Sequence, residues 1–186
     1  MGINGFGFGL EGMQSEWQPI TQSLSNFIST KIFDVREKLP FEDNSVEACF
    51  SHMLYCMALA NNDLENLNHE IHRILKPKGS LYLFNYPENN AYLLPFLDEQ
   101  TSMMFKNWIT WHYHVNTGNS PYKFTRTQHS ILFYSKSKKP ADVVFNKDEV
   151  IQAYKNPTDK RIQQRMREGH KGTVHYDVFS EDEDDG

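Results

Sequence analysis

The sequence of 186 residues predicts an α/β fold, and two patterns carry that prediction. The first is a strand, a helix and a second strand in succession between residues 46 and 84, which is typical of a parallel crossover unit. The second is a pair of segments rich in aromatic and β-branched residues, 105–115 and 130–135, which predicts two antiparallel strands. The length suits one well-packed domain.

The N-terminal segment, residues 1–30, is rich in Gly, Ser and Gln without a regular period, and we expect it to be irregular. Its glycines at 5, 7 and 9 have the spacing of a nucleotide-binding turn, but such a turn follows a hydrophobic strand, which is missing here. The next segments, Ile32–Val35 and Val46–Phe50, are short apolar runs that predict two buried strands.

The helix of the crossover unit begins at Asn62 or Asp63, either of which can cap it. Its apolar residues recur three and four positions apart as far as Leu75, and residues 76–79, KPKG, end it. The continuous apolar run Leu81–Phe84 then predicts a central parallel strand that helices cover on both faces.

The second half begins with a predicted helix over Asn90–Leu97, despite Pro95. The two antiparallel strands follow, and the loop between them, Asn116–His129, is longer than a hairpin needs, which makes it a functional candidate. A further helix is predicted from Thr158 to Glu168, ended by Gly169. From Ser180 onward, we expect a solvated and disordered acidic tail.

The charge is unevenly distributed along the chain. Residues 1–119 carry 7 basic and 13 acidic groups, residues 120–171 carry 12 and 5, and residues 172–186 carry six acidic groups and no Lys or Arg. A basic block attracts phosphate by releasing counterions, so nucleic acid becomes a candidate partner, although a solvated basic face has the same composition.

Two other features restrict the class of protein. No apolar run is long enough to span a bilayer and the N-terminus lacks the pattern of a secretory signal, so we expect a cytoplasmic protein with no membrane contact. The two cysteines, Cys49 and Cys56, form neither a disulfide framework nor a metal-binding pattern, so we expect reduced thiols and no metal site.

Two segments resemble the class I S-adenosylmethionine-dependent methyltransferases, namely residues 39–48, LPFEDNSVEA, and residues 73–79, RILKPKG. In that family the first text leads into the fourth strand of a Rossmann-like sheet, and the second ends the helix before the fifth strand. Two more segments resemble the DNA amino-methyltransferases that modify adenine or cytosine, namely residues 105–111, FKNWITW, and residues 124–137, FTRTQHSILFYSKS.

The resemblance implies a reaction and a set of domains. The reaction is transfer of a methyl group from S-adenosylmethionine to an exocyclic amine of DNA. The implied domains are an irregular segment at 1–30, a catalytic domain at 31–139, a partial target-recognition or DNA-contact region at 140–179, and an acidic tail at 180–186. The motif order resembles the β-type enzymes, whose Gly-rich cofactor loop comes last, and no such loop follows Gly172. We therefore expect a sheet that is incomplete on its cofactor side, and a second subunit or second copy that completes it.

The resemblance also assigns catalytic residues. The family holds the target amine with a polar residue, two prolines and an aromatic residue after the fourth strand, and the matching residues here run from Ser51 to Tyr55. Ser51 matches the polar position and Tyr55 the aromatic one, but both prolines are missing, so no fixed φ pre-sets the backbone carbonyl that should accept from the amine. Tyr55 is also readable as an ordinary core aromatic.

The remaining candidates concern the cofactor and DNA. Asp34 ends the first predicted strand, where an acid contacts the cofactor's adenine in related folds, although a turn residue has the same place. The candidates for DNA contact combine positive charge with an aromatic ring and lie in and after the long loop: Tyr122, Lys123, Arg126, Lys136, Lys138 and Lys139.

Two other functions remain open at this stage. A catalytically inactive or split subunit that binds DNA or a partner would explain the missing prolines and the missing cofactor loop. A small-molecule methyltransferase would explain residues 39–48 and the text of residues 52–55, HMLY, but it would leave the basic and aromatic block after Pro121 unexplained.

Overall fold

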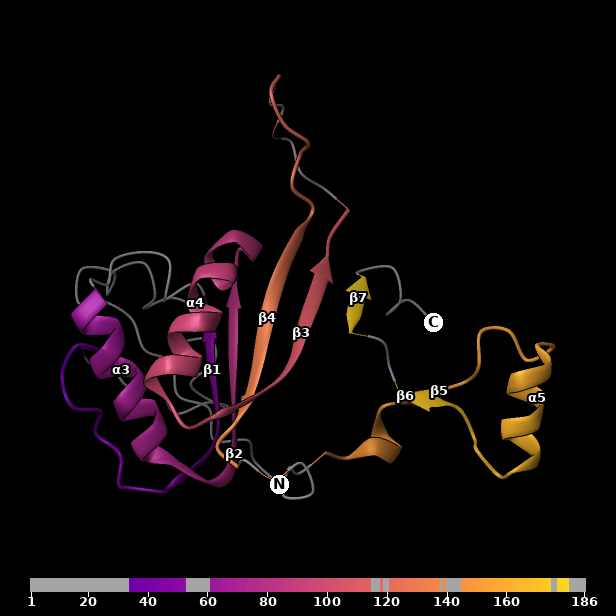
Figure 1. Cartoon of the computed structure of the whole chain (residues 1–186), viewed down its shortest axis with the longest axis horizontal. Coiled ribbons are helices and arrows are strands. Elements are labelled where there is room, and N and C mark those ends of the chain that lie inside the picture. The colour runs from indigo at the N-terminus through magenta and orange to yellow at the C-terminus, as the bar shows by residue number, and fades with distance from the viewer. Residues whose placement is uncertain are drawn as a thin grey trace, which may run out of the picture.

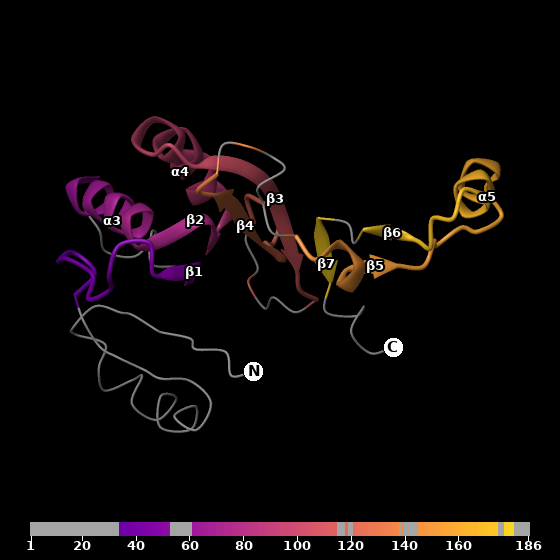
Figure 2. The same ribbon diagram turned by 90° about the horizontal axis from the view of Figure 1, so that it is seen from below.

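The computed structural model describes residues 34–52, 61–114, 118, 121–137, 139, 145–174 and 177–180. Its main body is a five-stranded mixed sheet with the strand order β1-β2-β4-β3-β7 (Figure 1). The strands are β1 Val46–His52, β2 Leu75–Asn85, β3 Met104–His112, β4 Gln128–Ser135 and β7 Val178–Ser180. Two helices, α3 Asn61–Ile74 and α4 Pro87–Gln100, pack on one face of this sheet (Figure 2).

The parallel crossover unit is confirmed as β1-α3-β2, since β1 and β2 pair in parallel. The helix ends at Ile74, one residue before the predicted end, and β2 begins at once at Leu75 rather than at Leu81. Gly79 is required at this start, because a Cβ atom there would lie 2.8 Å from the carbonyl oxygen of Lys76 and 3.0 Å from that of Glu47. The close approach of the β1 and β2 backbones therefore accounts for this glycine.

The core lies between the sheet and the two helices. Alternate residues of β2 and β4, among them Leu81, Leu83 and Leu132, point toward the helices and are fully buried. Helix α3 contributes residues spaced three and four apart, including Leu67 and Ile71, which places them on one side of the helix. The apolar side chains that alternate along the strands and those at helical spacing in α3 therefore pack into one core layer, as their spacing predicts.

The opposite face of the sheet is aromatic and only partly covered. Phe50 is 56% exposed, Tyr82 stacks on Phe133 with ring centroids 4.6 Å apart, and Phe84 is half-buried. The sequence predicted helices on both faces of the central strand. Within the described residues, α3 and α4 both lie on the face that carries the apolar core, so helices cover that face only (Figure 2).

The antiparallel pair predicted in the second half is confirmed as β3 and β4. Strand β4 also pairs antiparallel with β2, so it lies between β2 and β3. Strand β7 adds to the far edge of β3 in parallel. Ser180 is the last residue of this strand, so the prediction that disorder begins at Ser180 is wrong for that residue, and residues 181–186 lie outside the described part.

One predicted strand is not found. Asp34 and Val35 lie in a turn and not in a strand, while Ile32 and Phe33 lie outside the described residues. Val35 is nevertheless fully buried in the core, so its apolar character reflects packing of the turn against the core cluster. An apolar residue in a loop is read as part of a strand when only its local sequence is available.

The C-terminal arm consists of a short helix, α5 Lys160–Arg167, carried by two paired strands of two residues each, β5 Ile151–Gln152 and β6 Thr173–Val174. A short 3₁₀ helix, η3 Lys147–Glu149, precedes them. Asp159 caps α5 by accepting from the backbone N–H of Arg161 at 2.8 Å, and Gly169 ends the helix with a φ of 88°. The predicted helix over 158–168 is confirmed in its central part.

No helix in the described part of the chain combines the length and the apolar character needed to cross a membrane.

Candidate functional site

The candidate site lies at the carboxyl ends of β1 and β2. Because these strands are parallel, their last residues meet at one edge of the sheet, where Ser51 pairs with Leu83 and His52 pairs with Phe84. The first residues of β4 arrive at the same edge from the opposite direction, since Asn85 pairs with Ser130. Ligands of open α/β sheets bind at such carboxyl ends, which makes this edge the first place to look for chemistry.

A buried polar layer forms the floor of this edge. Ser51 is 3% exposed, and its Oγ has no hydrogen-bond partner among the described residues. The amide of Asn85 accepts from the backbone N–H of Tyr86 at 2.9 Å, but its Nδ2 has no partner within the described part of the chain. The side chain of Asn90 donates to the Oγ of Ser130 at 2.9 Å, and no described residue bonds to its Oδ1.

These groups are unusual because they are costly. A buried polar atom without a partner costs about 1–3 kcal/mol, so folded proteins keep few of them. Here a hydroxyl on Ser51, a donor on Asn85 and an acceptor on Asn90 occur at the ends of neighbouring elements. They fit a polar ligand that offers both donors and acceptors.

A row of flat rings lies at the same strand ends, on the opposite face of the sheet from the polar layer, because neighbouring residues of a strand point to opposite faces. The ring of Phe84 lies 4.7 Å from that of His52 and 4.9 Å from that of His129, measured between centroids. His129 in turn lies 5.2 Å from Tyr86 and 5.1 Å from Tyr113. Burial lowers the pKa of His129, and the nearby His52 and Arg126 lower it further. Burial therefore favours the uncharged form of the His129 ring.

Arg126 fixes the outer end of this row. Its guanidinium lies 4.2 Å from the centroid of the Tyr86 ring and forms an ion pair with Glu88. A backbone hydrogen bond and the hydrogen bond from Arg126 hold the pKa of Glu88 below its usual range. Arg126 lies just before β4, and Glu88 lies in the first turn of α4. The ion pair therefore links the segment that leads into β4 with the N-terminus of α4.

The long loop rises from this anchored end. Figure 1 shows the segment between β3 and β4 extending beyond the end of the sheet. Its root is closed by a bond from the N–H of Tyr113 to the carbonyl of Thr127 at 3.0 Å. Further out, Lys123 is exposed, and Tyr122 and Phe124 are 94% and 100% exposed. Tyr122, Lys123 and Arg126 therefore share one loop, as the sequence predicted.

The other predicted DNA-contact residues lie elsewhere. Lys136 follows the far end of β4, where its Nζ donates to the carbonyl of Leu75 at 2.7 Å and to Oδ1 of Asn44 at 2.9 Å. Burial lowers its pKa. Lys139 is exposed near that same end, while Lys138 lies outside the described residues. The eight residues of β4 thus separate the two sets by about 25 Å.

The two remaining predicted residues are placed differently. The carboxylate of Asp34 is held by the backbone N–H of Arg36 at 2.9 Å and by the guanidinium of the same residue. These bonds lower the pKa of Asp34 to about 2, the side-chain bond first and the backbone bond second. Tyr55 lies outside the described residues, so the structure places only Ser51 of the predicted catalytic pair.

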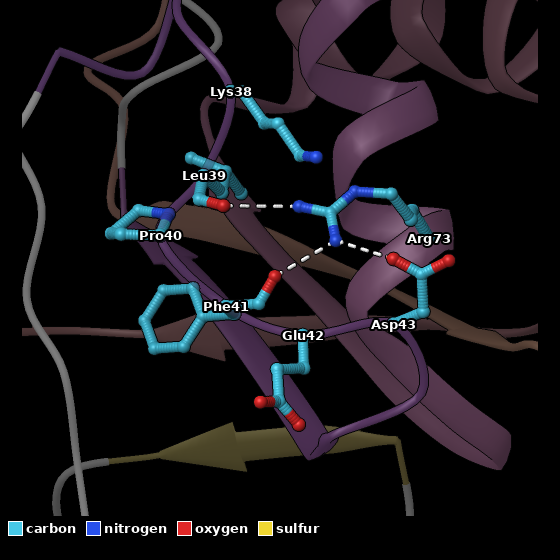
Figure 3. A pocket seen from close by; sticks show the side chains of 7 residues that line it. All are labelled: Lys38, Leu39, Pro40, Phe41, Glu42, Asp43 and Arg73. Carbon is cyan, nitrogen blue, oxygen red and sulfur yellow. Dashed lines mark hydrogen bonds and ion pairs between the residues drawn. The ribbon is translucent and has the colours of Figure 1, made fainter.

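A second concave region lies between α3 and the loop before β1, and Figure 3 shows its lining. Arg73 fills its centre by donating to the carbonyls of Leu39 at 3.0 Å and Phe41 at 2.8 Å, and to Asp43 at 2.7 Å. It also bonds to Glu70, whose carboxylate accepts from the N–H of Leu39. Every one of these partners belongs to the chain itself, so this region holds the loop in place.

Sequence reasoning missed most of the ring row. His52, Phe84, Tyr86, Tyr113 and His129 come from four separate parts of the chain, and nothing in their local spacing links them. The signal that would have found three of them is position, since His52, Phe84 and Tyr86 lie at or directly after the ends of two parallel strands. Among the described residues, no three His, Cys, Asp or Glu side chains gather in a way that could hold a metal ion.

Comparison with known proteins identifies relatives of this arrangement. The sequence model of the N6/N4 methyltransferases, described as DNA methylase, matches residues 41–184. The type II methyltransferase M1.MboII of Moraxella bovis is 42% identical over 86 residues, which are 46% of this chain and 31% of that protein. The type II methyltransferase M.HpaI of Haemophilus parainfluenzae is 31% identical over 81 residues, which are 44% of this chain and 25% of that protein. The matched region thus spans a third or less of either relative.

Solved structures support the fold. An S-adenosylmethionine-dependent methyltransferase of Methanosarcina mazei superposes with a TM-score of 0.55 at 13% identity, over 72% of this chain and 82% of that one. One from Aquifex aeolicus superposes with a TM-score of 0.50 at 11% identity, over 72% and 69%. The predicted Rossmann-like methyltransferase sheet is thereby confirmed as the fold.

Proposed function

This chain belongs to the DNA methylase family, and we propose that it carries the catalytic side of an enzyme that methylates an exocyclic amine of adenine or cytosine in DNA. The observation that carries the proposal is the edge formed by β1, β2 and β4, where buried polar atoms without partners among the described residues lie on one face of the strand ends and a row of flat rings lies on the other. A nucleobase is complementary to both features, because its edge offers hydrogen-bond donors and acceptors to the polar atoms and its flat face can stack on the rings.

The proposed reaction is a direct displacement. The methyl donor is S-adenosylmethionine, whose sulfonium makes the methyl carbon electrophilic. The amine nitrogen forms a bond to that carbon as the carbon–sulfur bond breaks, and the amine then loses a proton. The protein's own contribution is chiefly to hold the amine in line and out of water.

Ser51 is the proposed acceptor for the amine. Its Oγ is buried at the end of β1 and has no partner among the described residues, so a hydrogen bond from the amine would remove the cost of that burial. Tyr55 is the proposed stacking residue four positions later, and Asp34 the proposed contact for the cofactor's adenine. These three roles rest on the family resemblance together with the buried hydroxyl.

His52 offers a physical substitute for one missing proline. It directly follows Ser51, and its ring packs on Phe84 at 4.7 Å between centroids. A proline would restrict the backbone through its fixed φ, whereas a packed ring restricts it through contacts of the side chain. We propose that this packing holds the backbone after Ser51 in place.

DNA contact is proposed chiefly for two surfaces, with Lys138 and Lys139 as a further candidate. One is the loop of Tyr122, Lys123 and Arg126 above the ring row. The other is the C-terminal arm, where α5 carries exposed Lys160, Arg165 and Arg167 and has no buried residue. Lys136 is held at the far end of β4, so we propose that any DNA contact there comes from Lys138 and Lys139. DNA as substrate also supports the proposal of a cytoplasmic location.

A second subunit or second copy is proposed at the outer edge of β1. Within the described residues, β1 has a neighbour on one side only, and its Phe50 is 56% exposed. An open strand edge beside an apolar face is the kind of surface that pairs with another chain. Sedimentation at micromolar concentration checks this proposal, and a strictly monomeric chain would count against it.

The transfer assay tests the proposed function directly. Purified protein is incubated with S-adenosylmethionine labelled in its methyl group and with unmethylated genomic DNA, and the label on adenine or cytosine is measured. Ser51→Ala and Tyr55→Ala are expected to lose most of the transfer, whereas Tyr92→Ala, on the exposed surface of α4, is the matched control that keeps it.

A DNA-binding subunit that leaves the transfer to another chain is the second candidate. The observation in its favour is His52 and Met53 in place of the two prolines of the family. This candidate predicts that the chain binds DNA in a salt-sensitive way but transfers no labelled methyl group to it. It also predicts that calorimetric titration of S-adenosylmethionine into the chain shows no heat of binding. Transfer to DNA by the purified chain would rule it out.

A further inference from the structure

Two aromatic side chains of the long loop are exposed to a degree that is rare for their type. Phe124 is fully exposed and Tyr122 is 94% exposed, with Lys123 between them. An exposed aromatic ring is common singly, but two on one loop form a small apolar surface that points to a binding partner. The loop lies outside the sheet and contributes neither ring to the core.

The root of the same loop is firmly held. Arg126 is bound both to Glu88 and over the ring of Tyr86, and the Oγ1 of Thr125 donates to the carbonyl of Gly118 at 2.8 Å across the loop. These contacts join the loop to the start of α4 and close it on itself. The exposed rings are therefore carried on a braced base, on the segment that leads into β4 and His129.

The ligand that suits such a loop is duplex DNA. Phosphates attract the positive charge of Lys123, and the apolar rings can insert between stacked base pairs, as apolar wedges of other DNA-bending proteins do. An enzyme that modifies a base amine must take that base out of the stack, which opens a gap in the duplex. A wedge that fills the gap makes the open state more favourable.

We propose that Phe124 and Tyr122 form a wedge that inserts into the duplex and fills the space left by the displaced base. Arg126 is a positioning residue, because its bonds to Glu88 and Tyr86 keep the wedge from folding back when it is pushed into the stack. This inference rests on the proposed function, since it names how that same site gains access to its substrate.

Helix unwinding tests the wedge without requiring methyl transfer. The full chain is bound to nicked circular plasmid DNA, the nick is sealed by a ligase, and the change in linking number is measured after the protein is removed. The wild-type chain is expected to unwind the plasmid. A Tyr122→Ala/Phe124→Ala double variant is expected to lose most of this unwinding while binding DNA at low salt through the remaining basic residues.

Three variants sharpen the result. Phe124→Leu, which keeps an apolar wedge, is expected to retain part of the unwinding that Phe124→Ala loses. Arg126→Gln is expected to reduce the unwinding although both rings are present. Tyr92→Ala, which removes another ring that is 81% exposed, is the control and should behave as the wild type. Thermal unfolding checks that each variant is folded.

A second readout separates the wedge from the chemistry. On duplex DNA the double variant is expected to transfer methyl groups at about a tenth of the wild-type rate or less, and on heat-denatured DNA its loss is expected to be clearly smaller, because single strands need no opening. Equal losses on both substrates would overturn the wedge, as would DNA binding by the wild-type chain without unwinding. Absence of any DNA binding would instead overturn the proposed function together with the wedge.

Discussion

At the end of the sheet where β1 and β2 begin, charged side chains are held by partners from the same chain, whereas at the end where these strands finish, buried polar atoms lack such partners among the described residues. Arg73 and Lys136 belong to the first end and reach backbone carbonyls and side chains across 30 to 92 positions of sequence. Ser51, Asn85 and Asn90 belong to the second end.

The difference separates stability from function. Polar groups with all their partners inside the chain contribute to folding and leave little for a ligand to bind. Polar groups buried without partners reduce the stability of the fold, and they persist where a ligand makes use of them. Both ends carry polar groups, so what distinguishes them is whether these groups have hydrogen-bond partners within the described part of the chain.

The largest expected effect is on stability at the first end. Arg73→Met keeps the apolar stem but removes the bonds to Leu39, Phe41 and Asp43, and it leaves Glu70 half-buried without its cation. We expect the free energy of unfolding in urea to fall by about 2–3 kcal/mol. A loss of less than about 1 kcal/mol would mean that the hydrogen bonds at this end of the sheet do not make it the more stable end.

The next effect should appear at the second end and have the opposite sign for stability. Ser51→Ala removes a buried hydroxyl without a partner, so we expect the free energy of unfolding to rise by about 1 kcal/mol. Methyl transfer to DNA should fall about tenfold or more, because the proposed acceptor for the amine is gone. Thermal unfolding and the labelled-methyl assay measure the two quantities, and a variant that loses stability would contradict the comparison.

A smaller effect concerns the pH dependence of stability at His129. Burial lowers its pKa in the folded chain below the value of about 6.5 that an unfolded chain has. The unfolded state therefore binds the proton first, so the stability present above pH 6.5 is lost as the pH falls below that value toward the lowered folded pKa. Urea unfolding at several pH values should show a weaker slope in His129→Phe, and an unchanged slope would place the titration elsewhere.

The smallest effect should come from Lys76→Met, which is the matched control for Arg73→Met. Lys76 lies at the same end of the sheet and forms an ion pair with Glu47 at 2.9 Å, but the Glu47 side chain is 84% exposed and that of Lys76 44%. An exposed pair contributes about 0–1 kcal/mol, so the urea midpoint should hardly move. A loss comparable to that of Arg73→Met would show that charge alone, without burial and backbone partners, stabilises this end.

The sequence by itself determined the elements that local patterns encode. Helix α3 follows from apolar residues such as Leu67 and Ile71 at helical spacing, and its end follows from Pro77 and Gly79. The pairing of β3 with β4 follows from two long aromatic segments. Each of these is a property of neighbours in sequence, and the family texts at 39–48 and 124–137 are equally local.

Only the tertiary structure decided which residues share a site. His52, Phe84 and His129 meet because β1 pairs with β2 and β2 with β4, and such pairings join segments that lie far apart in the chain. The same pairings place Lys136 at the far end of β4 from Arg126, although the two are ten positions apart in one basic segment. Ser180 belongs to β7 because this strand pairs with the edge of β3 that β4 leaves open. Charge and composition say which residues a segment contains, but strand order and register decide which end of the sheet each residue reaches.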